Sequence, residues 1–123
     1  MTYAQVKERL EEIEADLAER QVEYEAVAEA RLRQVREWEY VWAKVYAATD
    51  KDAKVDDRKY DTLLTIAVKN PGLRQEWIDA EARYDALKAA IKVLESRASI
   101  GQSLLRSLVQ EGDRPQPAWS NSQ

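Results

Sequence analysis

The sequence predicts an all-α protein in which long amphipathic helices form a helical hairpin or coiled-coil bundle that oligomerises, with a short helix between them. Two observations predict this fold class. Glu, Ala, Leu, Lys and Arg dominate, and the 123 residues include only three Gly and three Pro, a bias that favours helix over sheet. Apolar residues also recur at steps of three and four over two long segments, as they do when one face of a helix is buried.

The first long segment, residues 3–48, contains no Gly or Pro. Its apolar residues fall on one helical face; they are Val6, Leu10, Ile13, Leu17, Tyr24, Ala28, Leu32, Val35, Trp42 and Tyr46. Between Gln21 and Leu32 the steps are all of four, which predicts a stutter in the register. A single helix here would be roughly 70 Å long at 1.5 Å per residue and would need a partner. The sequence leaves open whether the segment is one helix or two packed ones.

The middle of the chain predicts a connector followed by a short helix. Residues 49–59 (TDKDAKVDDRK) are charged and nearly free of apolar side chains, which is typical of a connector. The short helix is expected from about residue 58 to 69, with Asp56 or Asp57 as its N-cap. The tripeptide NPG at residues 70–72 then predicts a break.

The third segment has the most regular pattern in the chain. Eleven successive positions alternate steps of four and three, which predicts the seam of a coiled coil or bundle; they are Leu73, Trp77, Ala80, Tyr84, Leu87, Ile91, Leu94, Ala98, Gly101, Leu105 and Leu108. Ala98 and Gly101 narrow this seam, so that another backbone could approach closely. A glycine inside a helix costs about 1 kcal/mol, which close packing is expected to offset.

Apolar residues beside this seam predict self-association. Ile100, Leu104 and Val109 add a second apolar stripe, and one partner helix would not cover both stripes. We therefore expect oligomerisation through Leu94, Ile100, Gly101, Leu104, Leu105 and Leu108. From residue 112 the composition turns to Pro, Ser, Gln and Asn, which predicts a helical domain over residues 1–111 and a disordered tail over residues 112–123.

Composition also restricts the chemistry. The chain has no Cys and no His, which excludes disulfides, Cys/His zinc sites and imidazole-based triads. The glycines are too scattered for a phosphate-binding loop. Acidic pairs such as Glu76 and Asp79 have the spacing with which helical pyrophosphatases bind Mg²⁺, but 23 acidic residues produce such pairs by chance. We therefore expect a protein that is not an enzyme and has neither metal nor cofactor. No run of about 18 apolar residues is present, so we expect no membrane association and a cytoplasmic location.

The charge distribution leaves room for a local basic surface. The net charge is −4, whereas proteins that coat DNA usually have an overall basic surface. On the first helix, however, Arg33, Arg36, Tyr40 and Lys44 lie opposite the apolar face. Cations around an exposed aromatic ring can hold phosphates and stack a base. A solvated helix face of mixed charge is the alternative interpretation.

The order of the elements and the final helix, YDALKAAIKVLESRASIGQSLLRSL at residues 84–108, resemble the UvsY-like recombination mediators of tailed phages. The resemblance implies an all-helical protein that assembles into rings through its C-terminal helix and binds single-stranded DNA. It also implies an interaction with the single-strand binding protein and a part in loading a RecA-like recombinase. A basic pair ahead of aromatic residues contributes to DNA binding in that family. Lys44 matches one member of the pair, whereas Trp42 stands where the family has the other.

The resulting hypothesis is a single-stranded DNA-binding recombination mediator, without enzymatic activity, that acts as a homo-oligomer. DNA contacts are expected from Arg33, Arg36, Tyr40 and Lys44, joined by Lys51, Lys54, Arg58 and Lys59 near the connector. The alternative is a phage structural protein or assembly chaperone built on a coiled-coil oligomer. Such a protein would not bind nucleic acid, and Trp119 of the tail could serve as its docking residue.

Overall fold

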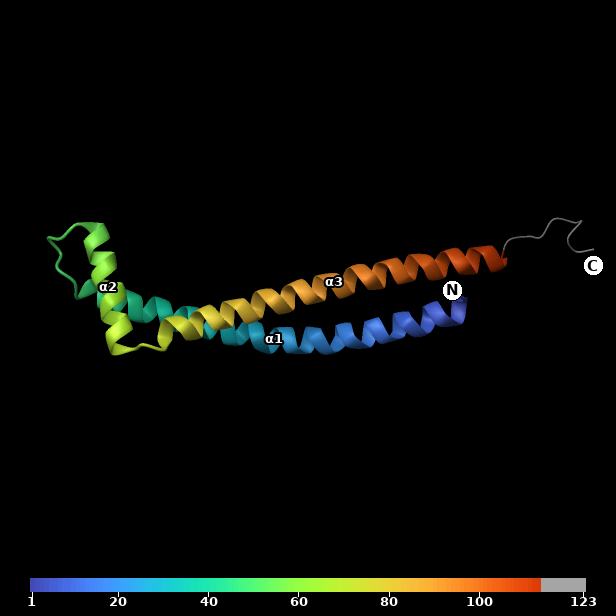
Figure 1. Ribbon diagram of the computed structural model, residues 1–123, viewed down its shortest axis with the longest axis horizontal. Helices are drawn as coiled ribbons and strands as arrows, with labels where there is room; N and C mark the ends of the chain where they lie inside the picture. Colours follow the sequence, from blue (N-terminus) through green and yellow to red (C-terminus); the bar gives the residue numbers. More distant parts are fainter. Residues whose placement is uncertain (114–123) are drawn as a thin grey trace, which may run out of the picture. The chain divides into compact units, whose positions relative to one another are not determined.

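The computed structural model describes residues 1–113, and within this range it contains three α-helices and no strand (Figure 1). α1 spans Tyr3–Ala47, α2 spans Val55–Lys69 and α3 spans Leu73–Asp113. The all-α fold class is confirmed, and the first segment is one helix. α3 extends two residues beyond the predicted boundary at residue 111. The rest of the predicted tail, including Trp119, lies outside the described residues.

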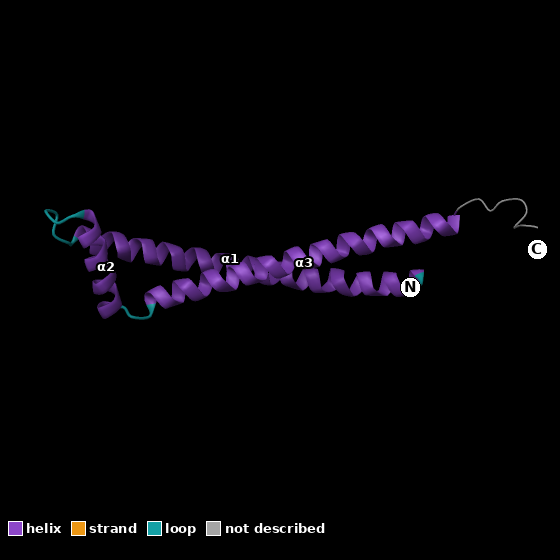
Figure 2. Cartoon of the chain, turned by 45° about the horizontal axis from the view of Figure 1, so that its top comes forward, coloured by secondary structure: helices purple, strands orange, loops and turns teal. Residues whose placement is uncertain are grey.

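The chain divides into two compact units, and α1 and α3 each contribute to both. Of the described residues, unit 1 contains Met1–Gln21 and those from Ala89 onward, and unit 2 contains Val22–Lys88. In unit 1 the beginning of α1 lies beside the later part of α3 (Figure 2). The core of unit 1 consists of one apolar stripe from each of these two helices. Its buried residues are Val6, Leu10, Leu94 and Ala98.

The heptad pattern predicted the buried face of α3 correctly. All eleven heptad positions are buried or half-buried, and Glu81 is the only other residue of α3 over residues 73–111 that is not exposed. At Gly101 the approach is close, since an added Cβ would lie 3.1 Å from Cδ1 of Leu10. The neighbour at this position is therefore a leucine side chain, not the backbone that the sequence led us to expect.

The residues predicted to mediate oligomerisation fall into two groups. Leu94 is buried, Leu105 and Leu108 are half-buried, and Gly101 faces Leu10, so these four lie on the seam within one chain. Ile100 and Leu104 are 65% and 40% exposed. Only the second group is classed as exposed in the monomer.

The face predicted for the middle of α1 is confirmed at Tyr24, Ala28 and Val35, which are half-buried, and is wrong at Leu32. Leu32 is 43% exposed, whereas the polar residues Arg31 and Gln34 are half-buried. The predicted stutter is absent, because five of the half-buried residues continue the alternating steps of three and four without a break; they are Tyr24, Val27, Arg31, Gln34 and Trp38. Arg31 can occupy a seam position because Glu81 on α3 pairs with it.

A set of hydrogen bonds joins the end of α1 to the start of α2. The carbonyl oxygen of Tyr46 accepts bonds from the Thr49 backbone N–H at 3.1 Å, from Thr49 Oγ1 at 2.6 Å and from Arg58 Nη2 at 3.2 Å. Arg58 Nε also donates to Thr49 Oγ1 at 2.9 Å. These bonds satisfy a carbonyl that the last turn of α1 would leave unpaired, and they fix where α2 begins.

α2 starts three residues earlier than predicted, at Val55. Lys54 is the N-cap, with an extended backbone and no side-chain cap hydrogen bond. The prediction that Asp56 or Asp57 caps the helix is therefore wrong. Both aspartates lie in the first turn instead, where a negative charge is favoured by the positive end of the helix dipole.

α2 packs in unit 2 through a narrow buried edge. Thr62 and Ile66 are 0% and 2% exposed, and the Thr62 hydroxyl is satisfied because it donates to the Arg58 carbonyl oxygen at 2.7 Å. The indole rings of Trp38 on α1 and Trp77 on α3 stack with centroids 5.5 Å apart and an interplanar angle of 7°. Unit 2 thus combines aromatic stacking with a small aliphatic core. No helix within residues 1–113 has an apolar stretch that could cross a bilayer.

Candidate nucleic-acid interface

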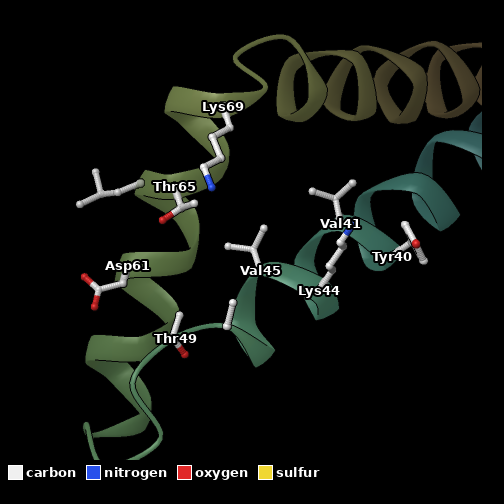
Figure 3. A pocket seen from close by; sticks show the side chains of 10 residues that line it. Tyr40, Val41, Lys44, Val45, Thr49, Asp61, Thr65 and Lys69 are labelled. Carbon is white, nitrogen blue, oxygen red and sulfur yellow. The ribbon is translucent and has the colours of Figure 1, made fainter.

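A wide groove lies between the last turns of α1 and one side of α2, within unit 2 (Figure 3). Its volume is about 790 Å³, within the range of roughly 300–1,000 Å³ typical of ligand sites. α1 and the residues that follow it contribute Tyr40, Val41, Lys44, Val45, Ala48 and Thr49, and α2 contributes Asp61, Leu64, Thr65 and Lys69. We call this feature the α1–α2 groove.

The α1–α2 groove has two cationic side chains that come from different helices. Lys44 belongs to α1, and Lys69 extends from α2 into the space between α2 and the α1 segment that carries Lys44 (Figure 3). Among the described residues of the lining, Asp61 is the only acidic one. Two lysines around an apolar floor can hold a phosphate, since each ammonium supplies three hydrogen-bond donors and a positive charge.

Tyr40 lies in the lining of the same groove and is 68% exposed. The exposure predicted for this residue from its helical position is confirmed. Tyrosine normally buries most of its ring, because the ring is a large apolar surface. An exposed ring beside lysines provides a flat face on which an unpaired base can stack.

The other predicted DNA-binding residues do not line the α1–α2 groove. Arg33 and Arg36 are exposed on α1 before the groove begins, Lys51 and Lys54 are exposed in the loop after α1, and Lys59 is exposed on α2. Arg58 is half-buried. The structure therefore brings together two of the eight predicted residues, Tyr40 and Lys44.

Arg58 differs from the other basic residues because its guanidinium group is engaged within the chain. Its Cζ atom lies 4.1 Å from the centroid of the Tyr46 ring, a cation–π distance. The same group donates hydrogen bonds to Tyr46 and Thr49. Arg58 thus positions α2 against the end of α1, and through α2 it positions Lys69.

Sequence reasoning missed Lys69. The residue is the last of α2, where a lysine is expected in any case because it complements the negative end of the helix dipole. No spacing in the sequence indicates that this lysine lies across from Lys44. A prediction of how α2 folds back against α1 would have been needed to find it.

A second cluster of charged and aromatic side chains lies on the seam of unit 2. Arg31 Nε is 3.0 Å from Glu81 Oε1, and the Arg31 Cζ atom is 4.7 Å from the centroid of the Tyr84 ring. The hydroxyl groups of Tyr24 and Tyr84 are hydrogen-bonded at 2.8 Å. Interaction with the Glu81 carboxylate raises the pKa of Arg31 above its ordinary value. The hydrogen bond with Tyr84, assisted by desolvation, raises the pKa of Tyr24 above 10.0.

No group of three or more acidic side chains within residues 1–113 converges on a position suited to a metal ion. Asp79, one member of the acidic pair noted in the sequence, instead accepts a hydrogen bond from Gln75 Nε2 at 2.8 Å. The α1–α2 groove therefore offers ammonium, hydroxyl and aromatic groups to a ligand, together with one carboxylate.

Comparison of the chain with protein-family models, curated proteins and solved structures finds no match.

Proposed function

We propose that the protein is a single-stranded DNA-binding accessory protein of homologous recombination, which acts as a homo-oligomer and assists the loading of a RecA-like recombinase. The observation that carries the DNA-binding part is the exposed ring of Tyr40 in a groove that Lys44 and Lys69 also line. Stacking of a base on an aromatic side chain contributes about 1–3 kcal/mol, and it requires an unpaired base. This combination favours single strands over duplexes.

The exposed cations outside the groove would extend the contact along a strand. Arg33 and Arg36 on α1, with Lys51 and Lys54 in the loop and Lys59 on α2, are accessible in unit 2. Each contact between a phosphate and one of these side chains releases a counterion, so the affinity falls as salt rises. One chain with a net charge of −4 would bind weakly, and an oligomer would gain affinity because several copies hold the same strand.

The test is fluorescence anisotropy with a labelled single-stranded oligonucleotide and the matching duplex, over a salt series, on protein of known mass in solution. Lys44→Ala and Lys69→Ala are each expected to lower the slope of log K against log salt by about 1. Tyr40→Ala is expected to cost about 1–3 kcal/mol at every salt concentration and to leave the slope unchanged. Lys7→Ala, at an exposed site in unit 1, is the matched control and should bind like wild type. Absence of binding at the lowest salt would contradict the proposal.

The alternative function, a structural or assembly protein without nucleic-acid binding, is favoured by a different observation. Large apolar side chains are exposed close together on one side of α2, namely Tyr60 at 63%, Leu64 at 48% and Val68 at 81%. Exposed apolar side chains that lie close together are typical of surfaces that bind other proteins. Stable oligomers that bind neither single-stranded nor duplex DNA would support this alternative.

A further inference from the structure

The side of α2 that faces away from its buried edge is apolar in the middle and acidic around it. Tyr60, Leu64 and Val68 follow one another at steps of four and are 63%, 48% and 81% exposed. Exposed aspartates accompany them on the same side, and we call the whole set the α2 outer face; it comprises Asp56, Asp57, Tyr60, Asp61, Leu64 and Val68. Asp61 and Leu64 border the α1–α2 groove. Three large apolar side chains are thus left uncovered on a helix of 15 residues.

The acidic character of the α2 outer face is not explained by helix stability alone. Asp56 and Asp57 suit the positive end of the helix, but Asp61 lies beyond the first turn, where the dipole no longer favours it. Asp61 shares the α1–α2 groove with Lys44 and Lys69, whereas Asp56 and Asp57 are not among the described residues that line it. Arg58 is engaged with Tyr46, and Lys59 projects about 100° around the helix from its neighbour Tyr60. Outside the groove, nucleic acid is therefore a poor occupant of the α2 outer face, because its phosphates would meet the carboxylates of Asp56 and Asp57.

Unit 1 carries a surface of the opposite kind. A groove of about 240 Å³ lies between the beginning of α1 and α3, and we call it the unit 1 groove. Its floor is apolar, and its described lining residues are Met1, Val6, Arg9, Leu10, Ile13, Arg97, Ile100, Gly101 and Leu104. The charged side chains among them are Arg97 and Arg9, and Arg9 Nη1 lies 3.1 Å from Glu12 Oε2. Ile100 and Leu104, on its α3 side, are 65% and 40% exposed.

The two surfaces are complementary in charge and similar in length. The apolar stripe from Tyr60 to Val68 extends about 12 Å, and the stretch of α3 from Arg97 to Leu104 extends about 10 Å, at 1.5 Å per residue. One surface surrounds its apolar centre with three carboxylates and the other borders its centre with Arg9 and Arg97. A helix that lays its apolar face into a groove between two helices is a common mode of recognition.

We propose that the α2 outer face of one copy of the chain docks into the unit 1 groove of a second copy. The contact joins two different surfaces, so it is heterologous, and each added copy presents a free surface of each kind for the next. The proposal rests on the homo-oligomeric part of the proposed function, and its test does not require DNA. In this contact, α2 of the neighbouring copy covers the exposed side chains of Ile100 and Leu104.

Two variants test this contact by complementation. Val68→Arg places a cation on the α2 outer face, where it would meet Arg9 and Arg97 of the next copy, and Ile100→Asp places a carboxylate in the unit 1 groove. Both positions are exposed, so each variant should fold, as judged by circular dichroism at 222 nm. Each variant alone should self-associate at least about 100-fold more weakly than wild type, because like charges oppose each other across the contact. Sedimentation velocity measures this loss.

An equimolar mixture of the two variants gives the decisive result. The Val68→Arg protein keeps its unit 1 groove and the Ile100→Asp protein keeps its α2 outer face, so these two intact surfaces can pair. In the reverse contact the introduced cation meets the introduced carboxylate, so like charges do not oppose each other there. The mixture should therefore associate at concentrations at which neither variant does so alone. Val22→Arg, at a 73% exposed site outside both surfaces, is the control and should assemble like wild type. The proposal is overturned if wild type stays monomeric, if only one of the two variants dissociates, or if the mixture does not pair. Loss of DNA binding with complementation intact would contradict the proposed function alone.

Discussion

Replacement of Gly101 by alanine is expected to stabilise the protein, although the site is tightly packed. Alanine is favoured over glycine inside a helix by about 1 kcal/mol. Against this gain stands a contact of 3.1 Å between the new Cβ and Leu10 Cδ1, which is shorter than an ordinary van der Waals contact. The outcome depends on how easily the Leu10 side chain can withdraw by a few tenths of an ångström.

The surroundings of Leu10 indicate that it can withdraw. Its Cδ1 atom is the end of a flexible side chain, and Leu10 borders the unit 1 groove of about 240 Å³. A modest departure from an ideal rotamer costs about 0.5 kcal/mol. The net gain in the free energy of unfolding is therefore about 0.5 kcal/mol, or up to about 1 kcal/mol if the rotamer relaxes fully. Isoleucine at the same position should instead cost about 1–2 kcal/mol, because its branches would also meet Leu10 Cβ and Cγ.

The assay is urea denaturation followed by circular dichroism at 222 nm, at one protein concentration, since self-association would otherwise change the apparent stability. Ser103→Ala, at an exposed site on the same helix, reports helix propensity without a packing change and should gain about 0.5 kcal/mol. The reasoning would be refuted if Gly101→Ala were less stable than wild type. It would be refuted equally if the alanine and isoleucine variants had the same stability, since Leu10 would then not lie over this position.

Three further predictions concern the seam of unit 2. Gln34→Met should raise the free energy of unfolding by about 1 kcal/mol, because Oε1 of Gln34 is buried without a hydrogen-bond partner among the described residues; a loss in urea denaturation would show that the amide has a partner. A double-mutant cycle of Trp38→Ala and Trp77→Ala should give a coupling energy of about 0.5–1.5 kcal/mol from the stacked rings, and a coupling near zero would contradict the stack. Finally, the raised pKa of Tyr24 means that the folded state retains the phenolic proton more strongly than the unfolded state. The contribution of the Tyr24 hydroxyl to stability is therefore complete below pH 10 and is lost as pH rises through the raised pKa. When denaturation is measured above pH 10, wild type should lose more stability than Tyr24→Phe. Equal losses in the two proteins would exclude this contribution.

The face that α3 buries could be predicted from the sequence because nearly every seam position is apolar and the spacing never changes. The same method was wrong at one position in the middle of α1. Periodicity measures hydrophobicity, and it therefore included Leu32, which is exposed, and did not include Arg31, which is half-buried. Arg31 can occupy the seam because Glu81 and Tyr84 on α3 contact its guanidinium group. Partners that are about 50 residues away along the chain are invisible to a pattern read over a few turns.

The candidate site shows the same limit. The exposure of Tyr40 follows from its position on α1 alone and could be predicted, whereas Lys69 reaches the groove only through the packing of α2. The sequence could only partly distinguish residues that bind another copy from residues that pack within one chain. A heptad seam is satisfied equally by a helix of the same chain or of another chain. Leu94 and Gly101 lie on the seam within the chain, and Ile100 is left exposed. A charged substitution at Leu105 would therefore disturb the hairpin itself, and Ile100 is the better position for testing assembly.

The placement of α2 links the two proposals. Its last residue, Lys69, contributes a cation to the α1–α2 groove, while its outer face presents Asp56, Asp57 and Asp61. A chain of net charge −4 can therefore offer a cationic site to a strand and an acidic surface to a second copy from one short helix. Both depend on the same anchor, because Arg58 holds the start of α2 to Tyr46 and Thr49. Loss of that anchor should impair DNA binding and assembly together. Lys69→Ala, by contrast, should impair only DNA binding, and Val68→Arg should impair assembly.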